Sequence, residues 1–212
     1  MKIKKFTFGP FQENTFLVYD FNGECAIIDP GCFGASDQKE LSDFITSENL
    51  KPTHLLNTHT HLDHISGNLF VYEKYGLKPQ IHEADLPILN MQEQSSLMYG
   101  LPCEKSPKPD FFIKEGDKIN IGKISLNVIF APGHSPGHVV FFDAISQQLI
   151  GGDVLFYNSI GRTDLPMGNH AQLIDSIKSK IFPLGENVKV YCGHGPETMI
   201  GFEKRTNPFL ID

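Results

Sequence analysis

The segment from His59 to Asn68 (HTHLDHISGN) constrains this chain more than any other part of it. Its first six residues hold three histidines and one aspartate, and they directly follow His54–Asn57, an apolar stretch typical of a β-strand. Imidazole and carboxylate groups are ligands for Zn²⁺ and other borderline divalent ions. The segment therefore predicts a cluster of metal ligands at the end of a strand.

Three later residues follow predicted strands in the same way, each directly after a glycine: His134, Asp153 and His194. A glycine lets the backbone turn sharply and approach an ion closely, so we expect all three beside the first cluster. Seven candidate ligands are then too many for one ion with a bound water. Two ions that share a bridging carboxylate and a bridging hydroxide would use all seven, which favours a two-metal hydrolase.

A closed zinc site that only stabilises the fold is the alternative. Such sites favour cysteine and stop at four ligands. The cysteines of this chain lie at wide, irregular spacings that match no zinc-binding pattern: Cys25, Cys32, Cys103 and Cys192. We expect at least three of them to be reduced packing residues.

Length and charge narrow the class of protein. A chain of 212 residues with 40% hydrophobic content can bury one substantial core, so we expect a single domain over residues 1–212. The net charge of −7 and the scattered lysines and arginines argue against a nucleic-acid partner. Residues 7–14 lack the apolar segment of a signal peptide, and no later run approaches membrane-spanning length. We expect a cytoplasmic protein with no membrane partner.

The stretches typical of strands recur along the whole chain. The first three are separated by turn signals such as Asn22-Gly23 and predict an antiparallel meander. The predicted strands are Lys2–Phe8, Thr15–Tyr19, Cys25–Asp29, His54–Asn57, Gln80–His82, Asp117–Ile121, Ile124–Phe130, Val139–Asp143, Gln148–Ile150 and Val188–Tyr191.

Helical periodicity lies between these strands. Ser36 and Asp37 are candidate caps of the first helix, Gly76 is expected to end the second, and Glu197–Arg205 predicts a closing helix. The predicted buried faces are Leu41, Phe44 and Ile45, then Ile65, Leu69 and Tyr72, then Leu173, Ile174, Ile177 and Ile181. Two mixed sheets with helices outside both faces account for this order.

Residues 83–109 interrupt the pattern with four prolines around a helical middle, Ile88–Leu101, and predict a helical insertion near the site. Met98 and Tyr99 could wall a substrate cleft. Apolar stripes of this kind more often dock helices on the body of a protein, and we favour that interpretation.

The pattern His59-x-His61-x-Asp63-His64, with His134, Asp153 and His194 downstream, resembles the HxHxDH signature and remaining ligands of the metallo-β-lactamase superfamily. Asp29-Pro30-Gly31 and Pro132–His138 also resemble motifs of this superfamily, so the resemblance covers nearly the whole chain. It implies an α/β fold of four layers, an αββα sandwich.

Two further stretches, Gly161–Pro166 and Gly193–Leu210, are similar to the short, single-domain hydrolases related to glyoxalase II. The resemblance implies that a metal-bridging hydroxide hydrolyses a small acyl-thiol, either S-lactoylglutathione or another thioester. A thiolate leaves readily, because a free thiol has a pKa near about 8.5, so no general acid is required. The two divalent ions would most simply be zinc, with iron or manganese as alternatives.

The same resemblance implies a role for each ligand. The first ion would bind His59, His61 and His134, the second would bind Asp63, His64 and His194, and Asp153 would bridge them. Asp63 would also orient the hydroxide and is the candidate catalytic residue. Asp29 would support the ligand loops from behind, and His138 would be a fold residue beside the site.

Arg162, Asp164 and Tyr99 are the candidate substrate contacts. In two-domain glyoxalase II enzymes a basic residue after the bridging aspartate contacts glutathione, and Arg162 occupies the matching place. Asp164, however, stands where that family has an aromatic residue. Arg162 could clamp a substrate carboxylate, or could pair with Asp164 and only hold its loop.

The remaining histidines are more simply explained by packing or capping: His54, His82 and His170. Four rival functions share part of the pattern. A mononuclear iron persulfide dioxygenase shares the ligands and the Gly-Arg-Thr-Asp stretch, and is the main alternative. A diiron oxygen- or NO-reducing module has Glu where His61 stands, and a β-lactamase normally carries a secretion signal. A metal-binding module without turnover would not need all seven ligands.

Overall fold

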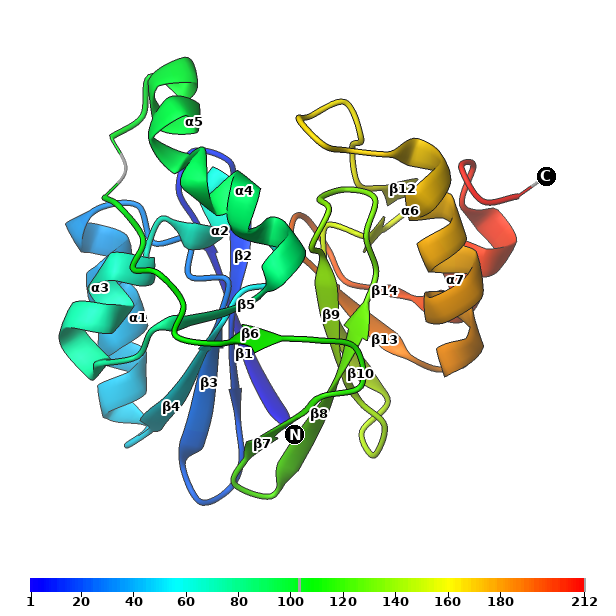
Figure 1. The fold of residues 1–212 in the computed structure, drawn as a ribbon. Coiled ribbons are helices and arrows are strands. Elements are labelled where there is room, and N and C mark those ends of the chain that lie inside the picture. The colour runs from blue at the N-terminus through cyan, green and yellow to red at the C-terminus, as the bar shows by residue number, and fades with distance from the viewer. Residues whose placement is uncertain (103, 212) are drawn as a thin grey trace.

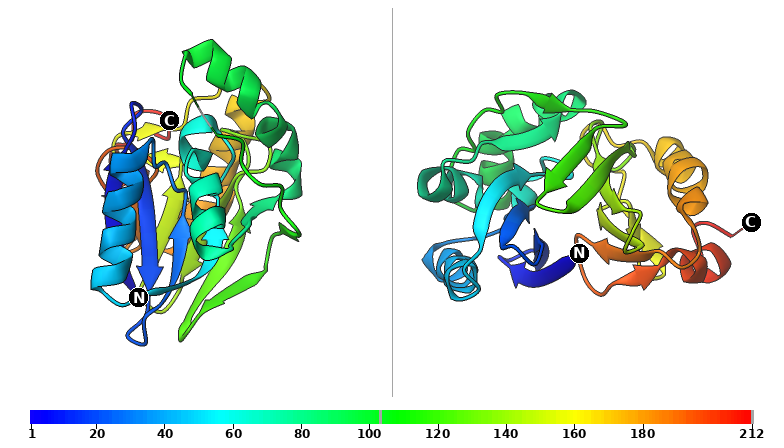
Figure 2. Two further views of the ribbon diagram at one scale, coloured as in Figure 1. Left: turned by 90° about the vertical axis from the view of Figure 1, so that its left-hand side faces the viewer. Right: turned by 90° about the horizontal axis from the view of Figure 1, so that it is seen from below.

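Two mixed, six-stranded sheets face each other, and helices cover the outer face of each (Figures 1 and 2). The computed structural model describes residues 1–102 and 104–211, so Cys103 lies outside the described residues. The arrangement confirms the predicted αββα sandwich. Among the described residues, no helix has the length and apolar content needed to cross a membrane.

The first sheet begins with the predicted antiparallel meander and continues with parallel strands. Its strands, in spatial order, are β1 (Lys2–Phe8), β2 (Glu13–Tyr19), β3 (Glu24–Ile28), β4 (Lys51–Leu56), β5 (Pro79–His82) and β6 (Phe112–Ile113). The second sheet has the order β14 (Thr198–Met199), β13 (Lys189–Cys192), β10 (Gln148–Gly152), β9 (Val139–Asp143), β8 (Ile124–Phe130) and β7 (Lys118–Ile121). A small hairpin pairs β11 (Leu155–Phe156) with β12 (Ser159–Ile160).

Five helices flank the sandwich among the described residues. Beside the first sheet lie α1 (Ala35–Ser47), α2 (Leu62–Ile65) and α3 (Asn68–Tyr75), and beside the second lie α6 (His170–Ser176) and α7 (Ile200–Thr206). Short π and 3₁₀ turns, Ile177–Ile181 and Phe182–Leu184, extend α6. The predicted insertion contains a 3₁₀ turn (Glu83–Asp85), α4 (Leu86–Asn90) and α5 (Gln92–Tyr99).

Alternation along the strands builds the layers. Phe16 in β2 and Phe141 in β9 pack in the core between the sheets. Their neighbours Leu17 and Phe142 point the other way, toward the helices outside each sheet. Because both faces are covered at the centre of each sheet, consecutive residues are buried in β2, β3, β9 and β10. The edge strand β7 instead alternates buried and exposed residues.

Two predicted helix features were wrong. The first helix begins at Ala35, and Gly34 precedes it without a side-chain cap. The Asp37 carboxylate instead accepts backbone hydrogen bonds from Phe33 and Gly9, at 2.9 and 3.2 Å, and so joins two loops. In α3, Tyr72 is exposed and Val71 is buried. The predicted face assumed one continuous helix after the histidines, whereas the chain breaks between α2 and α3 and the helical phase changes there.

The other helix ends agree more closely with the pattern. Gly76 adopts a left-handed conformation at φ 71° and ends α3, as predicted. The closing helix starts later than expected, because Thr198 and Met199 pair with β13 instead. Cys25, Cys32 and Cys192 are buried, free thiols, which confirms their role in packing.

Candidate metal centre

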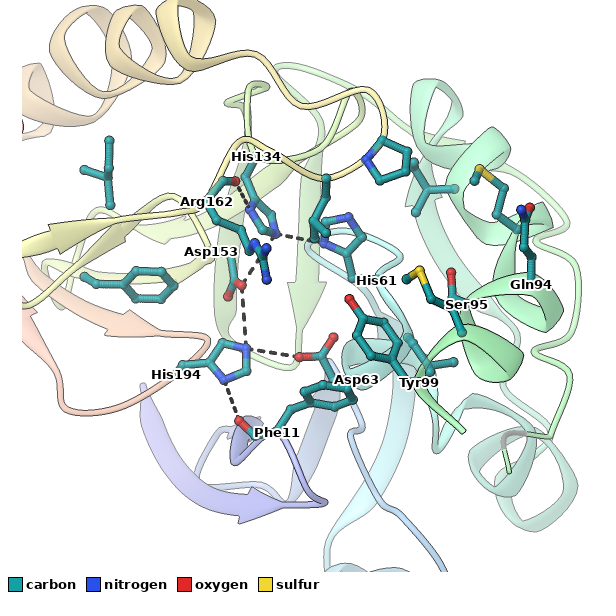
Figure 3. A pocket seen from close by; sticks show the side chains of 18 of the residues that line it. Phe11, His61, Asp63, Gln94, Ser95, Tyr99, His134, Asp153, Arg162 and His194 are labelled. Atoms are coloured by element: carbon teal, nitrogen blue, oxygen red, sulfur yellow. Dashed lines mark hydrogen bonds and ion pairs between the residues drawn. The ribbon is translucent and has the colours of Figure 1, made fainter. Parts of the chain in front are cut away.

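The seven predicted ligands, hereafter the metal-cluster residues, lie together at one edge of the sandwich. Figure 3 shows those that line the adjoining pocket: His61, Asp63, His134, Asp153 and His194. His59 and His61 belong to the loop after β4, and Asp63 and His64 to α2. The other three follow strands of the second sheet: His134 after β8, Asp153 after β10 and His194 after β13. The two sheets therefore contribute to one site because their ligand-bearing loops meet at the same edge.

Three imidazoles form the first group. The Nε2 atom of His134 lies 2.8 Å from Nδ1 of His61 and 3.2 Å from Nε2 of His59. Burial, and then the neighbouring histidines, lowers the pKa of His61 to about 3 and that of His59 well below its ordinary value. Both rings are therefore neutral at physiological pH, which is the form that binds metal.

Asp63, His64 and His194 form the second group. His194 Nε2 lies 3.1 Å from Asp63 Oδ2, and His64 Nε2 lies 3.9 Å from the same oxygen. Although burial lowers it, the carboxylates of Asp153, Asp63 and Asp29 raise the pKa of His64 well above its ordinary value. These carboxylates thus favour a positive charge in this part of the site.

Asp153 lies between the two groups. Its Oδ2 atom is 3.5 Å from Nε2 of His134 in the first group and 3.6 Å from Nε2 of His194 in the second. Its Oδ1 atom is 3.4 Å from Nε2 of His64, and both of these buried atoms lack a hydrogen-bond partner among the described residues. Buried polar atoms normally have hydrogen-bond partners. Imidazole nitrogen and carboxylate oxygen are also the atoms that coordinate divalent cations, so these residues fit such ions.

Asp29 and His138 support the cluster from behind. Asp29 accepts hydrogen bonds from the Thr58 amide and hydroxyl, at 2.7 and 2.6 Å, and its Oδ2 lies 3.1 Å from Nδ1 of His64. His138 is buried, stacks on His59 and accepts a hydrogen bond from the Asp153 amide at 3.1 Å. Both residues are therefore placed to orient neighbouring metal-cluster residues.

The three histidines outside the cluster behave differently from one another. His82 accepts a hydrogen bond from the Ala84 amide and stacks on Phe130, so it both caps and packs. His54 is half-buried and lies 3.0 Å from the Thr53 hydroxyl. The predicted role of His170 was wrong, because its side chain is exposed and the neighbouring Asn169 caps α6.

Sequence patterns did not identify Asn14 as part of the site. Its buried side chain donates hydrogen bonds to the carbonyls of Cys192 and Gly195, at 3.0 and 2.9 Å, and so fixes the loop that carries His194. The His194 ring in turn contacts the Phe11 carbonyl at 3.1 Å. Glu13 and Asn14 precede the predicted strand Thr15–Tyr19, and these two polar residues directly before a strand were the available signal.

Asp85 was missed as well. This fully buried carboxylate accepts hydrogen bonds from the amides of Thr60 and Gly137, at 2.6 and 2.8 Å, and a further one from the Thr60 hydroxyl. It therefore ties the loop of His59 and His61 to the loop that carries His134.

We predict that Asp85→Ala lowers the free energy of unfolding of the metal-free protein by about 2–4 kcal/mol, because two buried amides lose their acceptor. Urea unfolding in the presence of a chelator measures this change. Asp43→Ala, at an exposed carboxylate on α1, is the control and should leave the midpoint nearly unchanged. An equal response of the two variants would contradict the prediction.

A cavity of about 480 Å³ opens beside the metal-cluster residues. Met98, Tyr99 and Arg162 line it, whereas Asp164 does not. The favoured interpretation of Met98 as a docking residue was wrong: this residue is 66% exposed, and Leu86 and Leu89 pack α4 on the body instead. Figure 3 shows Tyr99 opposite Arg162, across the mouth of the site.

Arg162 and Asp164 form a two-pronged ion pair. Nε and Nη2 of the guanidinium each donate a hydrogen bond of 2.7 Å to a different carboxylate oxygen. This hydrogen bonding lowers the pKa of Asp164 to about 2, so the pair persists at neutral pH. Of the two roles considered for Arg162, the structure contains the pairing with Asp164. Its backbone carbonyl has a separate contact, 2.7 Å from Nδ1 of His134.

Two facing sheets, outer helices and a histidine–aspartate cluster at one edge define the class of metal-binding αββα proteins. The chain belongs to the metallo-beta-lactamase superfamily, whose family model matches residues 8–194. A curated relative from Haemophilus influenzae, hydroxyacylglutathione hydrolase GloC, is 36% identical over 202 residues, which cover 94% of this chain and 93% of that protein.

Two solved structures are also similar. One, described as BLEG-1 B3 metallo-beta-lactamase, has a TM-score of 0.91, is 36% identical and covers 100% of both chains. The other, described as TTHA1623 in a di-iron-bound form, has a TM-score of 0.88 and 37% identity and covers 98% of this chain and 100% of that chain. The first description names a class of β-lactamase, and the second names a bound metal but no activity.

Proposed function

We propose that this protein is a thioester hydrolase that works with two divalent metal ions. The position of Asp153 carries the proposal, because one carboxylate lies within 3.6 Å of imidazoles from both groups. The name of the Haemophilus relative supports a thioester substrate, and the di-iron form of TTHA1623 supports two ions. Bound metal ions would supply a water nucleophile that is ionised near neutral pH and charge that stabilises an oxyanion.

The protein's own residues would have two tasks in this reaction. His59, His61 and His134 would hold one ion, Asp63, His64 and His194 the other, and Asp153 both. Asp63 lines the cavity, so its carboxylate is placed to accept a hydrogen bond from water and to hold that water toward a substrate carbonyl. The thiolate product needs no protonation to leave, because thiols are acidic enough to be displaced as anions.

A panel of substrates tests the assignment. Protein loaded with zinc, manganese or iron is assayed for thiol release from S-lactoylglutathione and from thioesters of other thiols. Because the chain is similar to BLEG-1, a β-lactam is assayed as a second class of substrate. Oxygen uptake with a persulfide tests the alternative dioxygenase function. Hydrolysis of at least one thioester, faster than of the β-lactam and without oxygen uptake, is the expected result. Activity only toward the β-lactam or the persulfide would refute the proposal.

Metal content gives a separate prediction. After loading with excess zinc and desalting, we expect close to two ions per chain by elemental analysis, because the two groups of ligands share Asp153. The control is His170→Ala, which removes an exposed imidazole outside the cluster and should retain both ions. A single iron per chain that added zinc leaves unchanged would favour the dioxygenase.

A further inference from the structure

The cavity beside the metal-cluster residues has an apolar wall. Its volume, about 480 Å³, is within the range of small-molecule sites. The wall opposite the cluster comes from α4, α5 and two loops, and consists mainly of Phe11, Ile88, Met91, Met98, Tyr99 and Leu165. Phe11 and Tyr99 meet edge to face, with ring centroids 5.1 Å apart, although they are distant in the sequence. The part of a substrate that extends away from the metal-cluster residues, hereafter the substrate arm, must therefore contact hydrocarbon and aromatic surface.

Charged groups are scarce along this wall. Apart from the metal-cluster residues, the described residues that line the cavity include one charged side chain, Arg162, and no lysine. The other polar lining groups are the neutral side chains of Gln94, Ser95 and Ser159. A carboxylate on the substrate arm would have Arg162 as its one cationic partner in this part of the cavity.

Arg162 already has an anionic partner. Both prongs of its guanidinium bind Asp164, and these two residues are separated by only one position in the chain. An intramolecular partner acts at an effective concentration on the order of millimolar, so a dilute substrate carboxylate competes poorly with it. A desolvated carboxylate without a cation is strongly disfavoured against an apolar wall.

We propose that the preferred substrate is a thioester whose thiol portion is uncharged and apolar rather than glutathione, which carries two carboxylates. The acyl carbonyl would face the metal-cluster residues, and the uncharged arm would lie along Met91, Met98 and Tyr99. This inference rests on the proposed thioesterase function for the chemistry at the metal-cluster residues. It concerns only the thiol portion of the substrate. It separates this chain from the relative named for hydroxyacylglutathione.

Binding of two thioethers, which cannot be hydrolysed, tests the inference without turnover. S-hexylglutathione and S-hexyl-N-acetylcysteamine carry the same alkyl group, but the glutathione compound is larger and adds two carboxylates and one ammonium group. We expect zinc-loaded protein to bind the uncharged compound at least about tenfold more tightly in isothermal titration calorimetry, a difference of about 1.4 kcal/mol. Equal or tighter binding of S-hexylglutathione overturns the inference, and so does failure of both compounds to bind.

The ion pair is tested by Asp164→Asn, which keeps the side-chain shape and removes its charge. The freed Arg162 should then bind S-hexylglutathione about fivefold more tightly, while the affinity for the uncharged compound stays the same. The matched control is Asp43→Asn, because Asp43 is also exposed and paired, in its case with Lys39 on α1. No gain with Asp164→Asn, or the same gain with Asp43→Asn, contradicts the role given to the pair.

The two proposals fail in different ways. Protein that binds the uncharged thioether but hydrolyses no thioester refutes the thioesterase proposal and leaves the ligand class standing. Protein that hydrolyses thioesters but binds S-hexylglutathione more tightly refutes only the ligand class.

Discussion

Asp63→Asn is expected to lower the thioesterase kcat by about 10³-fold while the protein remains folded. The carboxylate lines the cavity and lies 3.1 Å from Nε2 of His194, so it is placed beside both a metal-cluster residue and the space that water would enter. Asparagine keeps the shape but loses the charge that attracts a cation and the basicity that accepts a proton. Loss of a positioned proton acceptor typically lowers rates by about 10²–10⁴-fold.

Steady-state kinetics on the metal-loaded variant measure this loss, and circular dichroism with urea unfolding verifies the fold. Asp43→Asn provides the control for removal of one negative charge far from the cavity. A rate for Asp63→Asn equal to that of the unmodified protein would eliminate the assignment of Asp63 as the catalytic residue.

Asp153→Asn should affect metal content as well as rate. Because Asp153 contacts His64, His134 and His194, its charge serves both groups of ligands at once. We expect zinc content to fall from close to two ions per chain to one or fewer, and kcat to fall by at least about 10³-fold. Elemental analysis after desalting, together with the thioesterase assay, measures both changes.

Asp143→Asn is the matched control for this second variant. Asp143 is also a buried aspartate, at the end of β9, but its carboxylate binds the Ile145 amide and the Ser146 hydroxyl within its own turn. The Asp143→Asn protein should retain both ions. An Asp153→Asn protein that keeps two ions and full activity would show that the two groups do not share a ligand.

The fold and the cluster could be predicted because their signals are local. A motif such as His59-x-His61-x-Asp63-His64 needs only six consecutive residues, and a glycine before each later ligand marks a strand end. Gly76 was predicted correctly for the same reason, since a left-handed helix end depends on one residue. The αββα order followed from strand and helix periodicity together with family resemblance.

Features set by distant contacts could not be predicted in this way. Asn14 binds Cys192, 178 residues away, and Asp85 binds Gly137, 52 residues away. Sequence patterns are assessed over short stretches of consecutive residues, and no such stretch contains both members of either pair. The very short strands β6 and β14 have two residues each and carry no periodic signal. Met98 was misjudged because an apolar side chain beside a cavity and one in a core look identical in sequence.

The hydrogen bonds between Asn14 and the loop of His194 also bear on how the protein folds. The second ligand group is complete only when the beginning of the first sheet meets the end of the second, a closure that spans most of the chain. Contacts of such long sequence separation form slowly, because loop closure lowers the chain entropy before any contact compensates for it. The ions would therefore bind to and stabilise a sandwich whose sheets have already assembled. They would not act as the nucleus for folding.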